Sequence, residues 1–552
     1  MALYGLAFVV RALLFALHPD AAYPDSYYYV DVARALQAGH GFNIDFIWSF
    51  VDVGGRIPAN PTLPIPSNAH WMPLASIVQL PTMWLLGPTQ LASAIPFLLI
   101  GALAAPLTWL IAREIGTGNR VALAAGVAVA IPGAAAIYMA QPDNFSLYQP
   151  LGLAAMWLAA RGLRGHRGSF ALAGLAVGLA TLARNDGILL GATVGLAFVW
   201  DRWRAWRSGG GRAPKIPWRY AFACLGLFVV VMAPWYLRQL AVFGSFSPSS
   251  TSGRILLIAN YEQLNSVTSD TSLGAFLGQG IGPLITSRVL GLVSAIQIYS
   301  VLACSVVLVP FVVVGAWSRR RSVDFGPFLL YAGLLFGASA LLFAVHVPYG
   351  TFLHSAVALV PFTFILGMEG VVIVVTWIAR HRRGWEEERA ARMFLIAAVG
   401  TLVLNAAAFG LLVNKSWNSE RDALISAGQA IDAAGGRTSD LVLSADPGGI
   451  EYFTGRGGVM TPDDSLDVIH RVATAYGVRW LVLQRSQIVA AMAPVLESKG
   501  RPAWIGPQIY ALPYDGPKTG DSVADAAPAM AVYPVCTTAS DTRCLGVARA
   551  GP

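Results

Sequence analysis

Charged residues are scarce in this sequence, and a few of them stand where they could act on a substrate. Asp25 opens a helical stretch inside a long loop, and Asp143 lies in a short Gln-Pro-Asp-Asn segment between two apolar runs. Arg184 and Asp186 flank a single asparagine in another short loop. A carboxylate can take a proton from a hydroxyl group, and a cationic side chain can hold a departing anion. Ionisable groups in apolar surroundings are candidates for a functional site, so these residues predict one.

His354 is a further candidate for a functional site. It follows Tyr349 by five residues and lies at the start of the late apolar run that begins near residue 353. No H-E-x-x-H, G-x-S-x-G, C-x-x-C or phosphate-loop motif occurs in the sequence. Zinc-protease chemistry and nucleotide-driven chemistry therefore have no support.

Each carboxylate also has a purely structural interpretation. Asp25 could cap the helix that follows it, as aspartate often does. Asp143 could be a turn residue after proline, and Asp186 could simply pair with Arg184. The sequence alone leaves these alternatives open.

The composition sets the class of protein that must position these residues. Of 552 residues, 55% are hydrophobic and only 12% are charged, whereas a soluble domain has about 25% charged residues. A soluble globular protein is therefore excluded. The net charge of +8 does not indicate a nucleic-acid partner, because the basic residues occur in short runs between apolar stretches. That arrangement is typical of a membrane protein.

The apolar runs predict the helices that cross the membrane. A membrane span needs about 20 apolar residues. Clear runs lie near residues 2–18, 90–112, 121–139, 146–162, 221–237, 289–317, 327–345, 353–379 and 393–414. Three shorter runs, 74–87, 169–183 and 187–200, are ambiguous by length alone.

The basic residues predict how the protein is oriented in the membrane and which of the short runs cross it. Five connections hold 19 Lys and Arg residues, and the remaining connections hold six, so we expect the five to be cytoplasmic. Two cytoplasmic connections must be joined by an even number of crossings, so 169–183 and 187–200 are predicted as a pair of spans. A connection from outside to inside needs an odd number, so 74–87 is predicted to lie at the outer interface and not to cross. The result is an α-helical polytopic protein of about eleven spans in a plasma membrane, with a cytoplasmic amino terminus. We expect the first run to be a span and not a cleaved signal, because Arg11 lies in its middle.

Two regions are predicted outside the membrane. The first outer loop, 19–72, contains an amphipathic helix from Ser26 to the glycines at 39 and 41. We therefore divide the chain into a membrane module, 1–414, and a small extracytoplasmic α/β domain, 415–552. That domain has a strand at 441–443, a turn at 446–449, a helix over 464–476 and a strand at 480–483. Cys536 and Cys544 lie in it, where an oxidising compartment permits a disulfide.

The order of these features resembles the GT-C membrane glycosyltransferases. The matching features are the acidic residue followed by tyrosines, the A-R-x-L-x-x-G-x-G-F stretch at 33–42, and the His-Trp-Met-Pro-Leu entry at 70–74 to a half-helix. Arg-Asn-Asp-Gly at 184–187 completes the series. The most similar branch is the family 39 type, which includes protein O-mannosyltransferases, aminoarabinose transferases and Rgt-like enzymes. The resemblance covers the chain to about residue 414.

The resemblance implies a function and roles for the candidate residues. It implies transfer of a hexose or pentose from a polyprenyl-phosphate carrier to a lipid, glycan or protein acceptor on the extracytoplasmic face, with inversion. Asp25 then corresponds to the catalytic base, and Asp143 to a residue that supports it or a divalent metal. Asp25 is followed by serine where many members have a second acid, so no metal is required by the pattern. Arg184, Asp186, Arg254, Tyr349, His354 and His70 are the candidates for substrate binding.

Three other classes of function fit the same sequence. A secondary transporter would also have many spans and a few buried charges, but it usually shows an internal repeat. A GT-C-like glycan ligase or polymerase would use a lipid-diphosphate-linked donor. A non-catalytic assembly protein would not need the carboxylate of Asp25.

Overall fold

The computed structural model describes residues 1–209, 211, 213–247, 249–382, 384–517, 525–536 and 542–544. The chain forms two compact units that interleave along the sequence. The helical unit consists of Met1–Ala21, Trp71–Ser250 and Gly280–Asn414, and the sheet unit of Ala22–His70, Thr251–Gln279 and Lys415–Pro552. The first outer loop therefore belongs with the carboxyl-terminal residues, which a single linear boundary near 414 does not anticipate.

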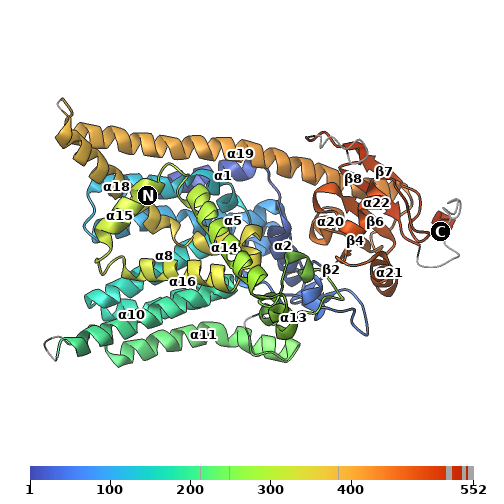
Figure 1. The fold of residues 1–552 in the computed structure, drawn as a ribbon, viewed down its shortest axis with the longest axis horizontal. Coiled ribbons are helices and arrows are strands. Elements are labelled where there is room, and N and C mark those ends of the chain that lie inside the picture. The colour runs from blue at the N-terminus through green and yellow to red at the C-terminus, as the bar shows by residue number, and fades with distance from the viewer. Residues whose placement is uncertain are drawn as a thin grey trace. The chain divides into compact units, whose positions relative to one another are not determined.

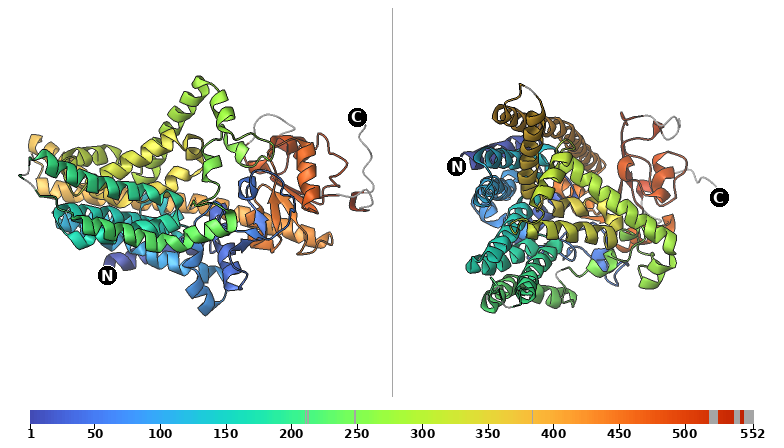
Figure 2. Two further views of the ribbon diagram at one scale, coloured as in Figure 1. Left: turned by 90° about the horizontal axis from the view of Figure 1, so that it is seen from below. Right: turned by 60° about the vertical axis from the view of Figure 1, so that its left-hand side comes forward.

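The helical unit is a bundle of apolar helices that lie side by side in the views of Figures 1 and 2. Helix α9 packs between α8 and α11, and α18 packs against α15 and α7. The helices of the bundle are α1 (Ala2–Leu17), α3 (Leu74–Ile77), α4 (Leu80–Leu86), α5 (Gln90–Ala102), α6 (Ala104–Glu114), α7 (Asn119–Ala130), α8 (Phe145–Arg164), α9 (Arg167–Ala183), α10 (Ile188–Arg207), α11 (Trp218–Phe243), α14 (Ile281–Ile298), α15 (Val309–Arg319), α16 (Gly326–Leu341), α17 (Thr351–Ala356) and α18 (Val360–His381). A last helix, α19 (Glu387–Ala433), has residues in both units.

The helices confirm a multi-pass membrane protein. Among the described residues, five helices are long and apolar enough to cross a membrane, or six if the bent pair Asn119–Ala130 and Gly133–Ala140 counts as one span. Shorter apolar helices occupy other predicted runs, including Ala2–Leu17 and Arg167–Ala183. The total of eleven spans and the orientation of the termini stay predictions.

Three predicted spans are not continuous helices. The run 121–139 bends by 50° after Ala130. The run 289–317 contains a π-helix at Tyr299–Ala303 and then a break, where Ser305 and Val306 have positive φ angles. The run 353–379 divides into α17 and α18. Pro361 at the start of α18 has no N–H to donate, and the three residues before it bond to carbonyls three positions back and not four. Apolar composition predicts such runs, but it does not reveal where the backbone turns.

The sheet unit contains a six-stranded sheet with the strand order β2-β5-β4-β6-β8-β7. The first four strands pair in parallel, and β8 pairs antiparallel with β6 and β7. The strands are β2 (Phe46–Ile47), β4 (Val442–Ser444), β5 (Gly458–Met460), β6 (Trp480–Gln484), β7 (Tyr510–Leu512) and β8 (Met530–Pro534). Edge strand β2 comes from the first outer loop, so this loop is part of the α/β core.

The predicted elements of the carboxyl-terminal part are largely confirmed. The strands at 441–443 and 480–483 appear as β4 and β6, and the helix over 464–476 appears as α21 (Leu466–Ala475). The predicted turn at 446–449 is wrong, because it is the start of α20 (Pro447–Thr454). Asp446 Oδ1 accepts a hydrogen bond from Gly449 N at 3.0 Å and so caps this helix. Cys536 and Cys544 form a disulfide.

Asp446 should make the stability of the sheet unit depend on pH. Burial raises the pKa of this carboxyl group to about 7, with a further rise from nearby Glu420, while the N–H of Gly449 opposes the shift. Because the folded state holds a proton that the unfolded state releases near pH 4, stability should fall as the pH rises from about 4 to 7. Asp446→Asn keeps a capping oxygen, and it should be more stable than the wild type at pH 8 by up to roughly 4 kcal/mol. Thermal unfolding of the detergent-solubilised protein at pH 4.5 and pH 8 measures this difference.

The exposed Asp467 on α21 provides the control, since Asp467→Asn should leave the pH dependence unchanged. A pH profile of Asp446→Asn that coincides with the wild-type profile would show that Asp446 does not cause the effect.

Candidate active site

Asp143 and His354 form the central contact of a polar cluster inside the helical unit. Asp143 has no exposed surface and lies in the short connection before α8. His354 lies in α17, and its Nε2 is 3.4 Å from Asp143 Oδ2. A buried carboxylate is costly unless a partner compensates its charge. The structure therefore brings together two of the residues that the sequence singled out.

The imidazole of His354 is held in one orientation by its surroundings. Nδ1 of His354 lies 2.9 Å from the carbonyl oxygen of Gly350, so Nδ1 carries a proton. The ring of Phe145 stacks on the imidazole, with 4.1 Å between the ring centroids and 13° between the planes. The backbone carbonyl fixes the tautomer and the phenyl ring fixes the plane, which leaves Nε2 directed at Asp143.

Arg184 and Asp186 form an ion pair that is tied to the same helix as His354. Arg184 Nε donates to Asp186 Oδ1 at 3.0 Å, and both side chains are about 15% exposed. The hydroxyl of Ser355 donates to Asp186 Oδ2. Because Ser355 follows His354 in α17, the pair at the α9–α10 turn and the Asp143–His354 contact share one support.

Two buried tyrosines hold helix α17 in place through hydrogen bonds. The hydroxyl of Tyr331, in α16, donates to the carbonyl oxygen of Ser355 at 3.1 Å. The hydroxyl of Tyr148, in α8, lies 3.0 Å from that of Tyr331. Both tyrosines have no exposed surface. The two bonds fix α17 against α8 and α16 and so position the serine that contacts Asp186.

The sequence did not predict Phe145, Tyr148, Tyr331 and Ser355 as parts of this cluster. A tyrosine in an apolar run is the one signal that could have found two of them, since a buried hydroxyl needs a hydrogen-bond partner. The serine and the phenylalanine carry no such signal, because their roles come from contacts between distant segments.

Asp25 lies in the first turn of α2 (Pro24–Gln37), in the sheet unit. The side chain of Ser26 makes the capping contacts at this helix end: its Oγ accepts from Ala22 N at 3.0 Å and from Tyr23 N at 3.2 Å. Since Ser26 fills the capping role, the alternative that Asp25 is present to cap the helix is weakened. Three buried tyrosines, Tyr27 to Tyr29, follow and anchor α2 in its unit.

The other candidates of the sheet unit lie near one another, at the polar connection 251–279. His70 Nδ1 is 3.3 Å from Thr251 Oγ1, and the rings of His70 and Trp48 are 5.3 Å apart. Arg254 lies against Gly55, where its Nη1 occupies the space that a Cβ would take. Gly55 has a φ of +68°, so its backbone also requires glycine. Tyr349 belongs to the helical unit and is 57% exposed.

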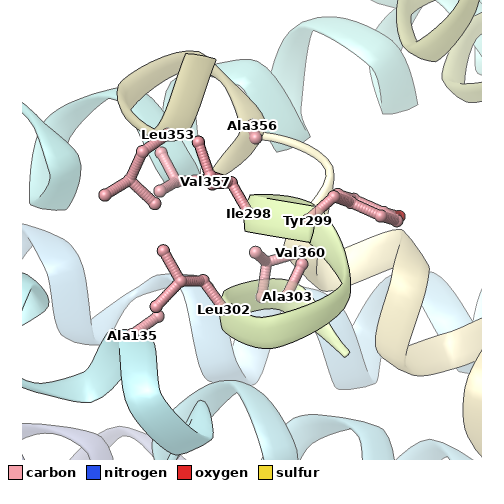
Figure 3. A pocket seen from close by; sticks show the side chains of 9 residues that line it. All are labelled: Ala135, Ile298, Tyr299, Leu302, Ala303, Leu353, Ala356, Val357 and Val360. Atoms are coloured by element: carbon pink, nitrogen blue, oxygen red, sulfur yellow. The ribbon is translucent and has the colours of Figure 1, made fainter. Parts of the chain in front are cut away.

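An apolar pocket adjoins α17 in the helical unit. Figure 3 shows Leu353 and Ala356 of α17 and the following Val357 near Ile298, the last residue of α14, and Leu302 of the π-helix. Leu353 directly precedes His354, so one face of this short helix lines an apolar space. The π-helix widens the backbone there, a feature that is frequent at functional sites.

Asp143 and His354 are also the groups of the helical unit that could hold a metal ion. An oxygen and an imidazole nitrogen suit a transition metal such as Zn²⁺ or Mn²⁺. These two atoms supply two ligands, whereas a tetrahedral site needs four. The geometry of this pair permits a metal and does not require one.

Known proteins are similar to this chain in part of the sequence and in the fold. Residues 71–236 match the family model described as dolichyl-phosphate-mannose-protein mannosyltransferase. The matched range contains Asp143, Arg184 and Asp186. No curated protein matches the sequence significantly.

Two solved structures share the fold over nearly the whole chain. One is ArnT from Cupriavidus metallidurans bound to undecaprenyl phosphate, with a TM-score of 0.53, 14% sequence identity and coverage of 98% of both chains. The other is the apo state of the same protein, with a TM-score of 0.53, 14% identity and coverage of 97% of both chains. The chain therefore has a GT-C membrane fold over nearly its whole length, and residues 71–236 are similar to a mannosyltransferase family.

Proposed function

We propose that this protein transfers a sugar from a polyprenyl-phosphate carrier to a lipid, glycan or protein acceptor at the extracytoplasmic face of the plasma membrane, with inversion at the anomeric carbon. The observation that carries the proposal is the buried Asp143–His354 contact, next to an Arg184–Asp186 pair, in a chain with the GT-C fold. The solved ArnT structure with undecaprenyl phosphate supports the class of donor.

In this reaction Asp25 acts as the general base. Its carboxylate takes the proton of the acceptor hydroxyl as that oxygen attacks the anomeric carbon. The bond between the anomeric carbon and the phosphate oxygen breaks, and its electron pair leaves with the polyprenyl phosphate. Attack from the face opposite to the leaving phosphate inverts the anomeric configuration.

Asp143 and His354 stabilise the charges of this reaction from the helical unit. His354 donates from Nδ1 to a carbonyl, so a second proton at Nε2 makes it a cation that faces Asp143. Asp143 keeps this ring directed, and the cation attracts negative charge that develops on the departing phosphate.

Arg184 contributes to binding of the donor phosphate. Its guanidinium is held by Asp186, and an arginine with a fixed plane binds phosphate with good geometry. Arg254, His70 and Tyr349 are the further proposed contacts to the substrates. The isoprenoid chain of the donor stays in the bilayer, where the apolar pocket beside α17 and the half-helices at 74–87 offer apolar surface.

The test is a transfer assay with the full-length protein in liposomes. Radiolabelled sugar on a polyprenyl monophosphate should move to a lipid or protein acceptor, and a chelator tests for a metal. Transfer from a polyprenyl diphosphate donor alone would instead favour a glycan ligase. Uptake of free sugar without transfer would favour a transporter.

The ion pair in which Asp186 holds Arg184 leads to a further prediction. Asp186→Ala should raise the KM for the donor and lower kcat/KM by about 10²-fold, since small displacements of a positioning group have effects of this size. Glu114→Ala removes a carboxylate that pairs with Arg161 and Arg164, away from this cluster, and should leave the KM unchanged. An unchanged KM in Asp186→Ala would show that Asp186 does not position the phosphate-binding arginine.

A further inference from the structure

Exposed tryptophans and arginines gather where α10 ends and α11 begins, at the lower left of Figure 1. The four tryptophans are 45% to 78% exposed. We call this surface the Trp–Arg patch, and it consists of Trp200, Trp203, Arg204, Trp206, Arg207, Trp218 and Arg219.

The two helix ends form one continuous surface. Asp201 is 2% exposed, and its carboxylate accepts hydrogen bonds from Lys215 N at 3.1 Å and Ile216 N at 2.9 Å. The rings of Phe198 and Trp218 meet at 4.9 Å between centroids. These contacts hold the segment before α11 against α10, so the basic residues of both helices have fixed relative positions.

The patch carries positive charge that other side chains do not neutralise. Asp201 lies 3.7 Å from Arg202 and neutralises the charge of that arginine. Across the described parts of the chain, Arg204, Arg207 and Arg219 have no ion pair. Arg207 stacks over Trp203 at 5.1 Å and Arg219 over Tyr220 at 5.0 Å. A stacked guanidinium keeps its N–H groups available at the edge of its plane, where they can donate to an anion.

The surroundings of the patch indicate which anion it meets. Exposed apolar residues continue from it along both helices, including Val199 on α10 and Phe222 on α11. Helix α11 is itself long and apolar enough to cross a membrane. Tryptophan is enriched at the level of lipid headgroups, so the arginines beside these tryptophans lie at the depth of the lipid phosphates. A nucleic acid or an acidic protein would approach from water and would not need the apolar continuation.

We propose that the Trp–Arg patch binds the headgroups of anionic phospholipids and so anchors the α10–α11 end of the helical unit at the membrane surface. Tryptophan rings supply the apolar contact at the interface, and Arg204, Arg207 and Arg219 bind the phosphates. The proposed sugar transfer does not use these residues, so the two proposals stand or fall separately.

Native mass spectrometry of the full-length protein tests this surface. The protein in detergent is mixed with equal amounts of phosphatidylglycerol and phosphatidylcholine of the same chain length, and the retained lipids are counted. Wild type should prefer phosphatidylglycerol. The variant Arg204→Gln/Arg207→Gln/Arg219→Gln should lose this preference by about 10²-fold, given a roughly fivefold contribution for each basic residue near an anionic surface.

A matched variant removes three arginines elsewhere. Arg120→Gln/Arg380→Gln/Arg389→Gln loses the same charge from exposed positions, two of which are already paired with Glu388 and Glu387. It should keep the preference for phosphatidylglycerol. Equal loss in both variants, or no loss in the first, would overturn the proposal. If the first variant does not fold, the single Arg207→Gln variant and the salt dependence of the wild-type preference take its place. A preference for phosphatidylglycerol that changes with neither would also overturn the proposal.

Discussion

Replacing Asp25 with asparagine should abolish sugar transfer and leave the protein folded. Loss of a general base typically costs 10² to 10⁴ in rate, so the transfer rate in liposomes should fall by at least about 10²-fold. The helix itself should survive, because Ser26 makes the capping contacts at its amino end. An asparagine in the first turn loses the interaction of one negative charge with the helix dipole, about 0.3 to 1 kcal/mol.

Asp20 offers a matched control for this experiment. It precedes α2 in the chain and is partly exposed, and Asp20→Asn removes the same charge from a position with no proposed part in the chemistry. Its transfer rate should equal that of the wild type. Gel filtration and the unfolding temperature check that Asp25→Asn is intact. A folded Asp25→Asn variant with full activity would eliminate Asp25 as the base.

Much of the fold is predictable from the sequence, because it depends on local patterns. Apolar runs near 90–112 and 221–237 are helices that pass as membrane spans, and the first-loop helix from Ser26 is α2. Strands β4 and β6 also follow from short runs of branched and aromatic residues between turn signals. In each case the residues that define the element are its own neighbours in sequence.

Other parts of the fold depend on pairings that no local pattern encodes. Strand β2 has two residues and exists because β5, more than 400 positions later, pairs with it in parallel. A strand of two residues is too short to show the alternation of apolar and polar residues that predicts a strand. The break at 305–306 likewise has no signal in the apolar composition of its run.

The candidate site shows the same division. Asp143, Arg184, Asp186 and His354 were predictable because charged residues are rare in apolar surroundings and are costly to bury. Ser355 was not predictable, since its importance comes from Asp186, which is 169 positions away. Nor was the role of Phe145, whose ring fixes the plane of His354. Groups that support a site through tertiary contacts have ordinary residue types, so only the structure identifies them.

The contact between Asp143 and His354 leads to the second large effect. Asp143→Asn should lower the transfer rate by about 10² to 10³-fold, because the imidazole loses the carboxylate that directs it and compensates its charge. His354→Gln should have a similar effect. If the two residues act through their contact, the double variant should be no slower than the slower single variant, since coupled residues are not additive.

Rates of the wild type, both single variants and the double variant form a complete cycle for this contact. Asp324→Asn is the matched control, because Asp324 is also a carboxylate of the helical unit that lies near a cation, 3.2 Å from Arg164, at another place in the bundle. It should transfer sugar at the wild-type rate. Fully additive losses in the cycle would mean that Asp143 and His354 act independently, and wild-type activity in Asp143→Asn would remove this pair from the mechanism. Coupled losses, in contrast, would mean that the carboxylate acts through the ring. If Asp143 contacted the acceptor on its own, Asp143→Asn would lower the rate by the same factor with and without His354.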